Sequence, residues 1–99
     1  MNILEDILYP VVDEAKGSIE SAKDMEKKPD AVLFGVNGLD SLGLVSFVVM
    51  AEEKVDDLTD IELTLASEKA MSRRNSPFLT LQTLADYIQE CLDEEGYDG

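Results

Sequence analysis

Apolar residues recur at helical spacing in the first part of the chain. In residues 3–23 they follow the three- and four-residue intervals of an amphipathic helix, at Ile3, Leu4, Ile7, Leu8, Val11, Val12, Ala15, Ile19 and Ala22. Pro10 interrupts this pattern, so we expect either a kink in one long helix or the start of a second one there. The charged stretch 23–29 ends at Pro29 and is predicted to be a linker.

A second helix is predicted from Ser41 to about Lys54 or Asp57, with Asp40 as its N-cap. One stripe at helical spacing holds Leu42, Val45, Val48, Val49, Glu52 and Val55, and an adjoining stripe holds Leu44, Phe47 and Ala51. The preceding segment 31–39 is broken by glycines and is predicted to be a loop. Its apolar side chains are expected to fill the core, namely Val32, Leu33, Phe34 and Val36.

The last third of the chain predicts a short helix and a long one. Residues 61–65 alternate in polarity, which favours an extended link, and residues 66–71 are predicted to form a short helix. Thr80 caps the final helix, which ends near Gly96 and has Leu81, Leu84, Ile88 and Cys91 or Leu92 on one face. The predicted fold is all-α: three main helices and one short helix in a single domain, 1–99. Its core spans about 3–92, and 93–99 is an acidic tail.

Charge and composition restrict the partners. The chain has 22 acidic and 8 basic residues and a net charge of −14. Nucleic-acid binding needs a cationic surface, so this balance argues against it and favours a basic patch on another protein. No apolar run is long enough for a membrane span, and the first ten residues lack the positive charge of a signal peptide. A single cysteine fits a reducing compartment, so we expect a cytoplasmic protein. We also expect it to be a monomer.

Catalytic and metal chemistry lack their usual residues. The chain has no histidine and one cysteine, Cys91, so histidine-activated nucleophiles and structural zinc or iron–sulfur sites cannot be built in their usual form. The acidic run 56–62 lacks the glycine and ligand spacing of a calcium loop, so it is read as a solvated face. We therefore expect no metal site, and no enzyme acting on its own.

The sequence Gly38-Leu39-Asp40-Ser41-Leu42 resembles the acyl carrier protein family, in which Asp-Ser-Leu opens the second helix. The resemblance extends over about residues 3–92 and implies an acyl-carrier-protein-like bundle. It implies that a 4′-phosphopantetheinyl transferase esterifies Ser41, with Asp40 and Leu42 as the matching neighbours. The attached 4′-phosphopantetheine carries acyl or aminoacyl groups as thioesters, and the further partners are acyl-loading and acyl-transfer enzymes with basic or apolar docking patches.

The predicted position of Ser41 suits this modification. As the first residue of a helix it is exposed and lies close to backbone N–H groups that have no partner within the helix. A phosphodiester there meets the positive end of the helix dipole, an interaction of about 0.3–1 kcal/mol at an exposed site.

The second helix departs from the family pattern. Fatty-acid carriers usually have acids two and five residues after the serine, where this chain has Gly43 and Ser46 on what we expect to be an exposed face. No charge occurs from Ser41 to Ala51, so the predicted partner-binding residues are Leu44, Phe47, Glu52 and Glu53. This favours a specialised pathway, such as lipid or lipopolysaccharide acylation or polyketide assembly, over bulk fatty-acid synthesis. The alternatives are an aminoacyl carrier of the D-alanyl type and an acidic helical adaptor without a prosthetic group.

Overall fold

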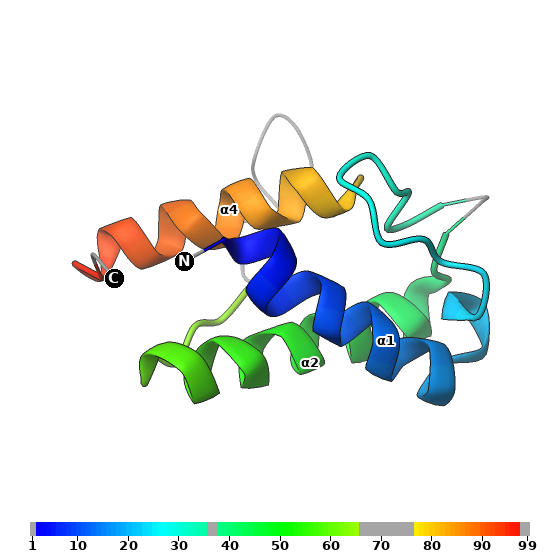
Figure 1. Cartoon of the computed structure of the whole chain (residues 1–99), viewed down its shortest axis with the longest axis horizontal. Coiled ribbons are helices and arrows are strands. Elements are labelled where there is room, and N and C mark those ends of the chain that lie inside the picture. Colours follow the sequence, from blue (N-terminus) through cyan, green and yellow to red (C-terminus); the bar gives the residue numbers. More distant parts are fainter. Residues whose placement is uncertain (1, 36–37, 66–76, 98–99) are drawn as a thin grey trace.

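The computed structural model describes residues 2–35, 38–65 and 77–97. Its helical elements are the π-helix η1 (Leu4–Leu8), α1 (Tyr9–Ser18), the 3₁₀ turn η2 (Glu20–Ala22), α2 (Ser41–Thr59) and α4 (Leu81–Glu94). The described ranges contain isolated β-bridges but no β-strand. In Figure 1, α2 and α4 run along the long axis on opposite sides, and η1 and α1 cross between them. The prediction of a helical fold is confirmed.

The first helix is continuous through Pro10 but changes its winding there. Leu4–Leu8 has π-helical hydrogen bonding, and Pro10 lies in the first turn of α1, which begins at Tyr9. Proline has no backbone N–H to donate, so it is tolerated in a first helical turn. The helix ends at Ser18, earlier than predicted, because Ile19 adopts an extended conformation and residues 20–22 form a separate turn.

The inner face of α2 combines small and large side chains. Its buried residues are Gly43, Phe47, Val48, Ala51 and Val55. The opposite face exposes Leu42, Val45 and Val49, which retain 82%, 59% and 45% of their accessible surface. The helix extends past the predicted end and stops at Thr59, where Asp60 takes the left-handed conformation (φ 59°) typical of a helix C-terminus.

The segment after α2 returns to the core. Residues 61–65 have no regular secondary structure, and Leu63 and Leu65 are buried whereas Glu62 and Thr64 are exposed, as their alternation predicts. A carboxylate oxygen of Glu52 accepts a hydrogen bond from the backbone N–H of Leu65 (2.7 Å). The short helix predicted over 66–71 lies outside the described residues.

The last helix begins and ends as predicted. The Thr80 hydroxyl accepts a hydrogen bond from the Thr83 N–H (3.2 Å), and the Thr83 hydroxyl accepts one from the Thr80 N–H (3.0 Å), which makes a reciprocal capping box. Six residues of α4 are buried: Leu81, Leu84, Ala85, Tyr87, Ile88 and Leu92. Cys91 is half-buried beside this face.

The loop before α2 is tied to the start of α4 by its backbone. The N–H of Leu33 donates to the carbonyl of Leu79 (2.8 Å), and the N–H of Leu81 donates to the carbonyl of Ala31 (3.1 Å). Side chains alternate between the two sides of such extended backbone, so Leu33 is buried whereas Val32 and Phe34 are exposed. The expectation that Val32 and Phe34 fill the core is therefore wrong, and Val36 lies outside the described residues.

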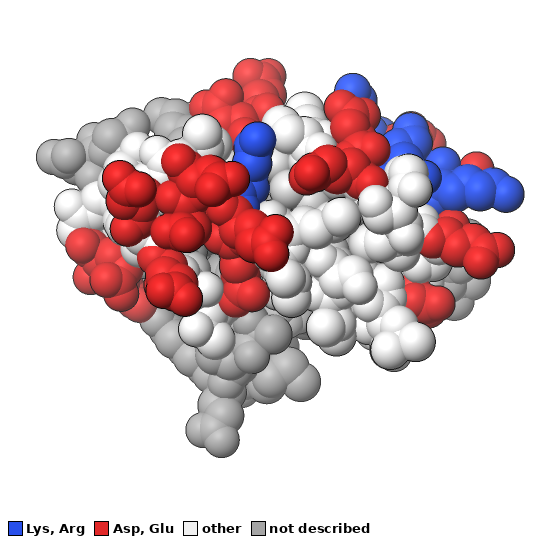
Figure 2. Space-filling view, turned by 90° about the horizontal axis from the view of Figure 1, so that it is seen from below, with Lys and Arg blue, Asp and Glu red and all other residues white. Residues whose placement is uncertain are grey.

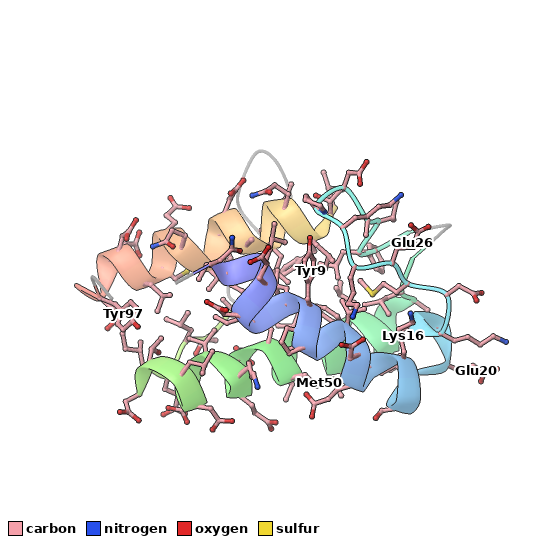
Figure 3. All side chains as sticks on the ribbon, viewed as in Figure 1. Tyr9, Lys16, Glu20, Glu26, Met50 and Tyr97 are labelled. Carbon is pink, nitrogen blue, oxygen red and sulfur yellow. The ribbon has the colours of Figure 1, made fainter. Side chains whose placement is uncertain are left out.

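All of the fully buried described side chains are apolar or aromatic, and they form one core between the helices. Tyr9 of α1 and Met50 of α2 are half-buried and border this core (Figure 3). Among the described residues, no helix combines the length and the apolar character that crossing a bilayer requires.

Candidate functional site

Ser41 is the first residue of α2 and is exposed. The residue before it, Asp40, has extended backbone, and its carboxylate accepts a hydrogen bond from the Gly43 N–H (2.7 Å). This bond satisfies one of the N–H groups that a helix start leaves without a carbonyl partner. The predicted N-cap is confirmed, and it places the Ser41 hydroxyl at the beginning of a regular helix.

A second residue contacts Asp40 from a distant part of the chain. The Ser21 hydroxyl, in η2, donates to a carboxylate oxygen of Asp40 (3.4 Å) and accepts from the Asp40 backbone N–H (3.4 Å). Both hydrogen bonds are long. η2 and the start of α2 therefore meet at one end of the molecule, where Glu20 is labelled in Figure 3. Nothing in the local sequence around either residue indicates this contact.

An uncharged surface follows Ser41 along the outer side of α2. Leu42, Val45 and Val49 lie on this surface at helical spacing, and Ser46 is exposed too. We call Leu42, Val45 and Val49 the outer apolar face. The C-terminal half of the helix instead exposes Glu53, Asp56 and Asp57, and Asp60 follows it. Figure 2 shows this side of the molecule, where an uncharged area adjoins a dense group of acidic side chains.

The predicted partner-binding residues are in different environments. Phe47 is fully buried in the core, so its assignment to a partner surface is wrong in this structure. Leu44 is half-buried and packs against the core. Glu52 is half-buried and bonded to Leu65, which leaves Glu53 as the exposed member of the acidic pair.

The expectation that Gly43 lies on an exposed face is also wrong. Gly43 is buried, and a β-carbon built on it would collide with the Ser21 hydroxyl oxygen. The sequence analysis missed Val45, Val49 and Ser21 as residues of this site. One available signal for the buried face was Gly43 itself, because glycine inside a helix costs stability and often marks a close approach by a neighbouring element.

The ion pairs among the described residues involve α1 and the segment after η2. Lys27 pairs with Asp13 (3.2 Å) and Lys28 with Glu26 (3.3 Å), and all four side chains are about half exposed or more. Exposed pairs of this kind contribute only about 0–1 kcal/mol each to stability. They leave most of the acidic charge of the chain uncompensated.

Comparison with protein-family models finds no match to this chain, and comparisons with curated proteins and with solved structures find no significant match.

Proposed function

We propose that this protein is a carrier that holds acyl intermediates as thioesters on a 4′-phosphopantetheine arm attached to Ser41. The observation that carries the proposal is the exposed serine at the start of α2, between the N-cap Asp40 and the exposed Leu42. These three residues form the Asp-Ser-Leu sequence that resembles the acyl carrier protein family. The chain itself catalyses no reaction in this proposal, and partner enzymes act on its arm.

The residues at this position fit the proposed group. Ser41 offers an accessible hydroxyl, and a phosphodiester formed there lies beside the N–H groups of the first helical turn. Asp40 is held by the Gly43 N–H, so its carboxylate is engaged in the cap. When bound, the arm supplies a thiol that forms thioesters with acyl groups.

The outer apolar face supports a role in docking partner enzymes. Full burial of one such side chain is worth about 1.5–3 kcal/mol. The exposed fractions of Leu42, Val45 and Val49 then correspond to about 3–6 kcal/mol in total if a partner covers them. Association itself costs at least about 4 kcal/mol, so this contact gives a weak and short-lived complex. A carrier that passes between enzymes requires that property.

The same face favours a specialised pathway. A surface without charge next to Ser41 gains little from a basic enzyme patch, whereas Glu53, Asp56 and Asp57 can meet one farther along α2. We propose lipid or lipopolysaccharide acylation or polyketide assembly as the context, and an aminoacyl cargo as the alternative. An adaptor without a prosthetic group is the second candidate, because the outer apolar face could bind a partner without any arm.

Intact mass separates these functions. The purified protein is incubated with coenzyme A and a broad-specificity phosphopantetheinyl transferase, and we expect a gain of one phosphopantetheine group. Ser41→Ala should gain nothing and should keep the wild-type circular dichroism and melting temperature. The matched control is Ser18→Ala, an exposed serine at the end of α1, which should be modified normally. An unmodified wild type would reject the carrier and favour the adaptor, whereas a modified Ser41→Ala protein would reject Ser41 as the attachment site.

A further inference from the structure

We infer that Ser21 is a positioning residue for Ser41: its hydroxyl, packed against Gly43, fixes Asp40 and therefore the first turn of α2. This inference rests on the proposed carrier function. It adds a residue from another part of the fold to the modification site, one that no motif around Ser41 contains.

The Ser21 hydroxyl contacts the residue before Ser41 in two places. It donates to a carboxylate oxygen of Asp40 and accepts from the Asp40 N–H, each over 3.4 Å. The same carboxylate oxygen accepts the much shorter hydrogen bond from Gly43 (2.7 Å). Each of the two bonds to Ser21 is weak, but together they hold both the main chain and the side chain of Asp40.

Gly43 allows this contact because it has no side chain. A β-carbon there would collide with the Ser21 hydroxyl oxygen, and would lie 2.9 Å from the bonded Asp40 oxygen and 3.1 Å from a methyl carbon of Ile19. Glycine is a poor residue inside a helix, and Gly43 has no positive φ that would require it. The close approach of Ile19 and Ser21 is therefore the reason for glycine at this position.

The turn that carries Ser21 is itself fixed. Ile19 leaves α1 with its N–H still bonded to the carbonyl of Ala15 (2.7 Å), and the Ala22 N–H bonds back to the carbonyl of Ile19 (3.0 Å). Ala22, next to Ser21, is fully buried. Because this turn is anchored to α1 and to the core, the contact ties the start of α2 to the first helix.

This arrangement predicts a separation of the two kinetic constants of modification. Without the Ser21 hydroxyl, Asp40 keeps its bond to Gly43 but loses its link to α1, and Ser41 is held less firmly in the reactive position. The outer apolar face is unchanged, so binding to the transferase is preserved. We expect Ser21→Ala to lower kcat about two- to tenfold, the range that corresponds to one hydrogen bond, and to leave KM for the carrier within about twofold of the wild type.

The kinetic test compares loading of four proteins by the same transferase with coenzyme A: wild type, Ser21→Ala, Ser21→Thr and Ser18→Ala. Ser21→Thr keeps the hydroxyl and should recover most of the rate, and Ser18→Ala should match the wild type. Equal kcat for Ser21→Ala and wild type would overturn the inference. A fall shared by Ser21→Thr would also overturn it, because the hydroxyl would then not be responsible.

A double-mutant cycle measured by urea unfolding tests the contact between Ser21 and Gly43 in the protein without phosphopantetheine. Gly43→Ala alone should lower the urea midpoint although alanine favours helices, whereas the same change in the Ser21→Ala background should lower it much less or raise it. An equal effect in both backgrounds would show that Ser21 and Gly43 are not coupled and would overturn the inference. If the two are coupled but the wild type accepts no phosphopantetheine, the proposed function fails while the contact stands.

Discussion

The two faces of α2 predict opposite effects for two alanine substitutions. Phe47 is fully buried and faces the core, whereas Leu42, five residues earlier, keeps 82% of its accessible surface. We expect Phe47→Ala to destabilise the fold strongly and Leu42→Ala to leave it nearly unchanged. The second substitution should instead weaken the productive encounter with a partner enzyme.

The magnitudes follow from burial. Removing a buried phenylalanine side chain costs about 3–5 kcal/mol, because the lost contacts and the remaining cavity both contribute. A domain of this size has a free energy of unfolding of about 5–15 kcal/mol, so Phe47→Ala should remove a large part of it. Leu42 buries only the remaining 18% of its surface, which corresponds to about 0.3–0.5 kcal/mol. The slightly higher helix propensity of alanine offsets part of that small loss.

Urea unfolding followed by circular dichroism measures both effects. With a slope of about 2 kcal/mol per molar urea, Phe47→Ala should lower the midpoint by about 2 M, and Leu42→Ala should lower it by less than about 0.3 M. Loading kinetics on the same proteins, at a temperature where both are folded, should show the higher KM for Leu42→Ala. A loss below about 1 kcal/mol for Phe47→Ala, or a larger loss for Leu42→Ala than for Phe47→Ala, would mean that the helix buries its other face.

Two further predictions concern charge. The net charge of −14 makes the folded chain repel itself, and salt screens this repulsion, so the melting temperature should rise between about 10 mM and about 200 mM NaCl. Mg²⁺ should raise the melting temperature more than Na⁺ at equal ionic strength. A melting temperature that does not change with either salt would contradict this prediction. Glu52→Ala removes the acceptor of the Leu65 N–H and should cost about 1–2 kcal/mol in urea unfolding, whereas the exposed neighbour Glu53→Ala should stay within about 0.5 kcal/mol of the wild type. Equal costs for the two glutamates would show that the Glu52 bond contributes nothing.

The helix starts of this protein are encoded locally, so the sequence alone predicts them. Asp40 and Thr80 each precede an apolar periodic segment, and each forms the expected cap. The end of α1 was predicted too late, because Ile19 continues the apolar spacing although its backbone is extended. When the apolar spacing continues past the end of a helix, the local sequence does not show where packing makes the backbone change direction.

The orientation of α2 was the main feature that periodicity did not determine. Apolar residues occur on both sides of the helix, so hydropathy alone does not distinguish the face with Leu42 and Val45 from the face with Phe47 and Val48. The core side is set by the elements that pack there, and Ile19 and Ser21 approach the helix closely at Gly43, where a side chain is absent. The Ser21 contact was not predictable for a related reason, since it joins residues 19 positions apart through side-chain geometry.

The backbone bonds between the loop before α2 and the start of α4 give the last helix an indirect role at Ser41. Three N–H groups are involved: Leu33 bonds to Leu79, Leu81 to Ala31, and Gln82 to Pro29. These bonds join residues that are 46 to 53 positions apart in the chain, so they form only after a long loop has closed. We therefore expect α4 and the loop to open as one cooperative unit. A substitution that undocks α4 therefore also releases the segment that leads into Ser41. On the proposed carrier function, variants far from Ser41 should therefore lower its modification without contacting the serine or a partner enzyme.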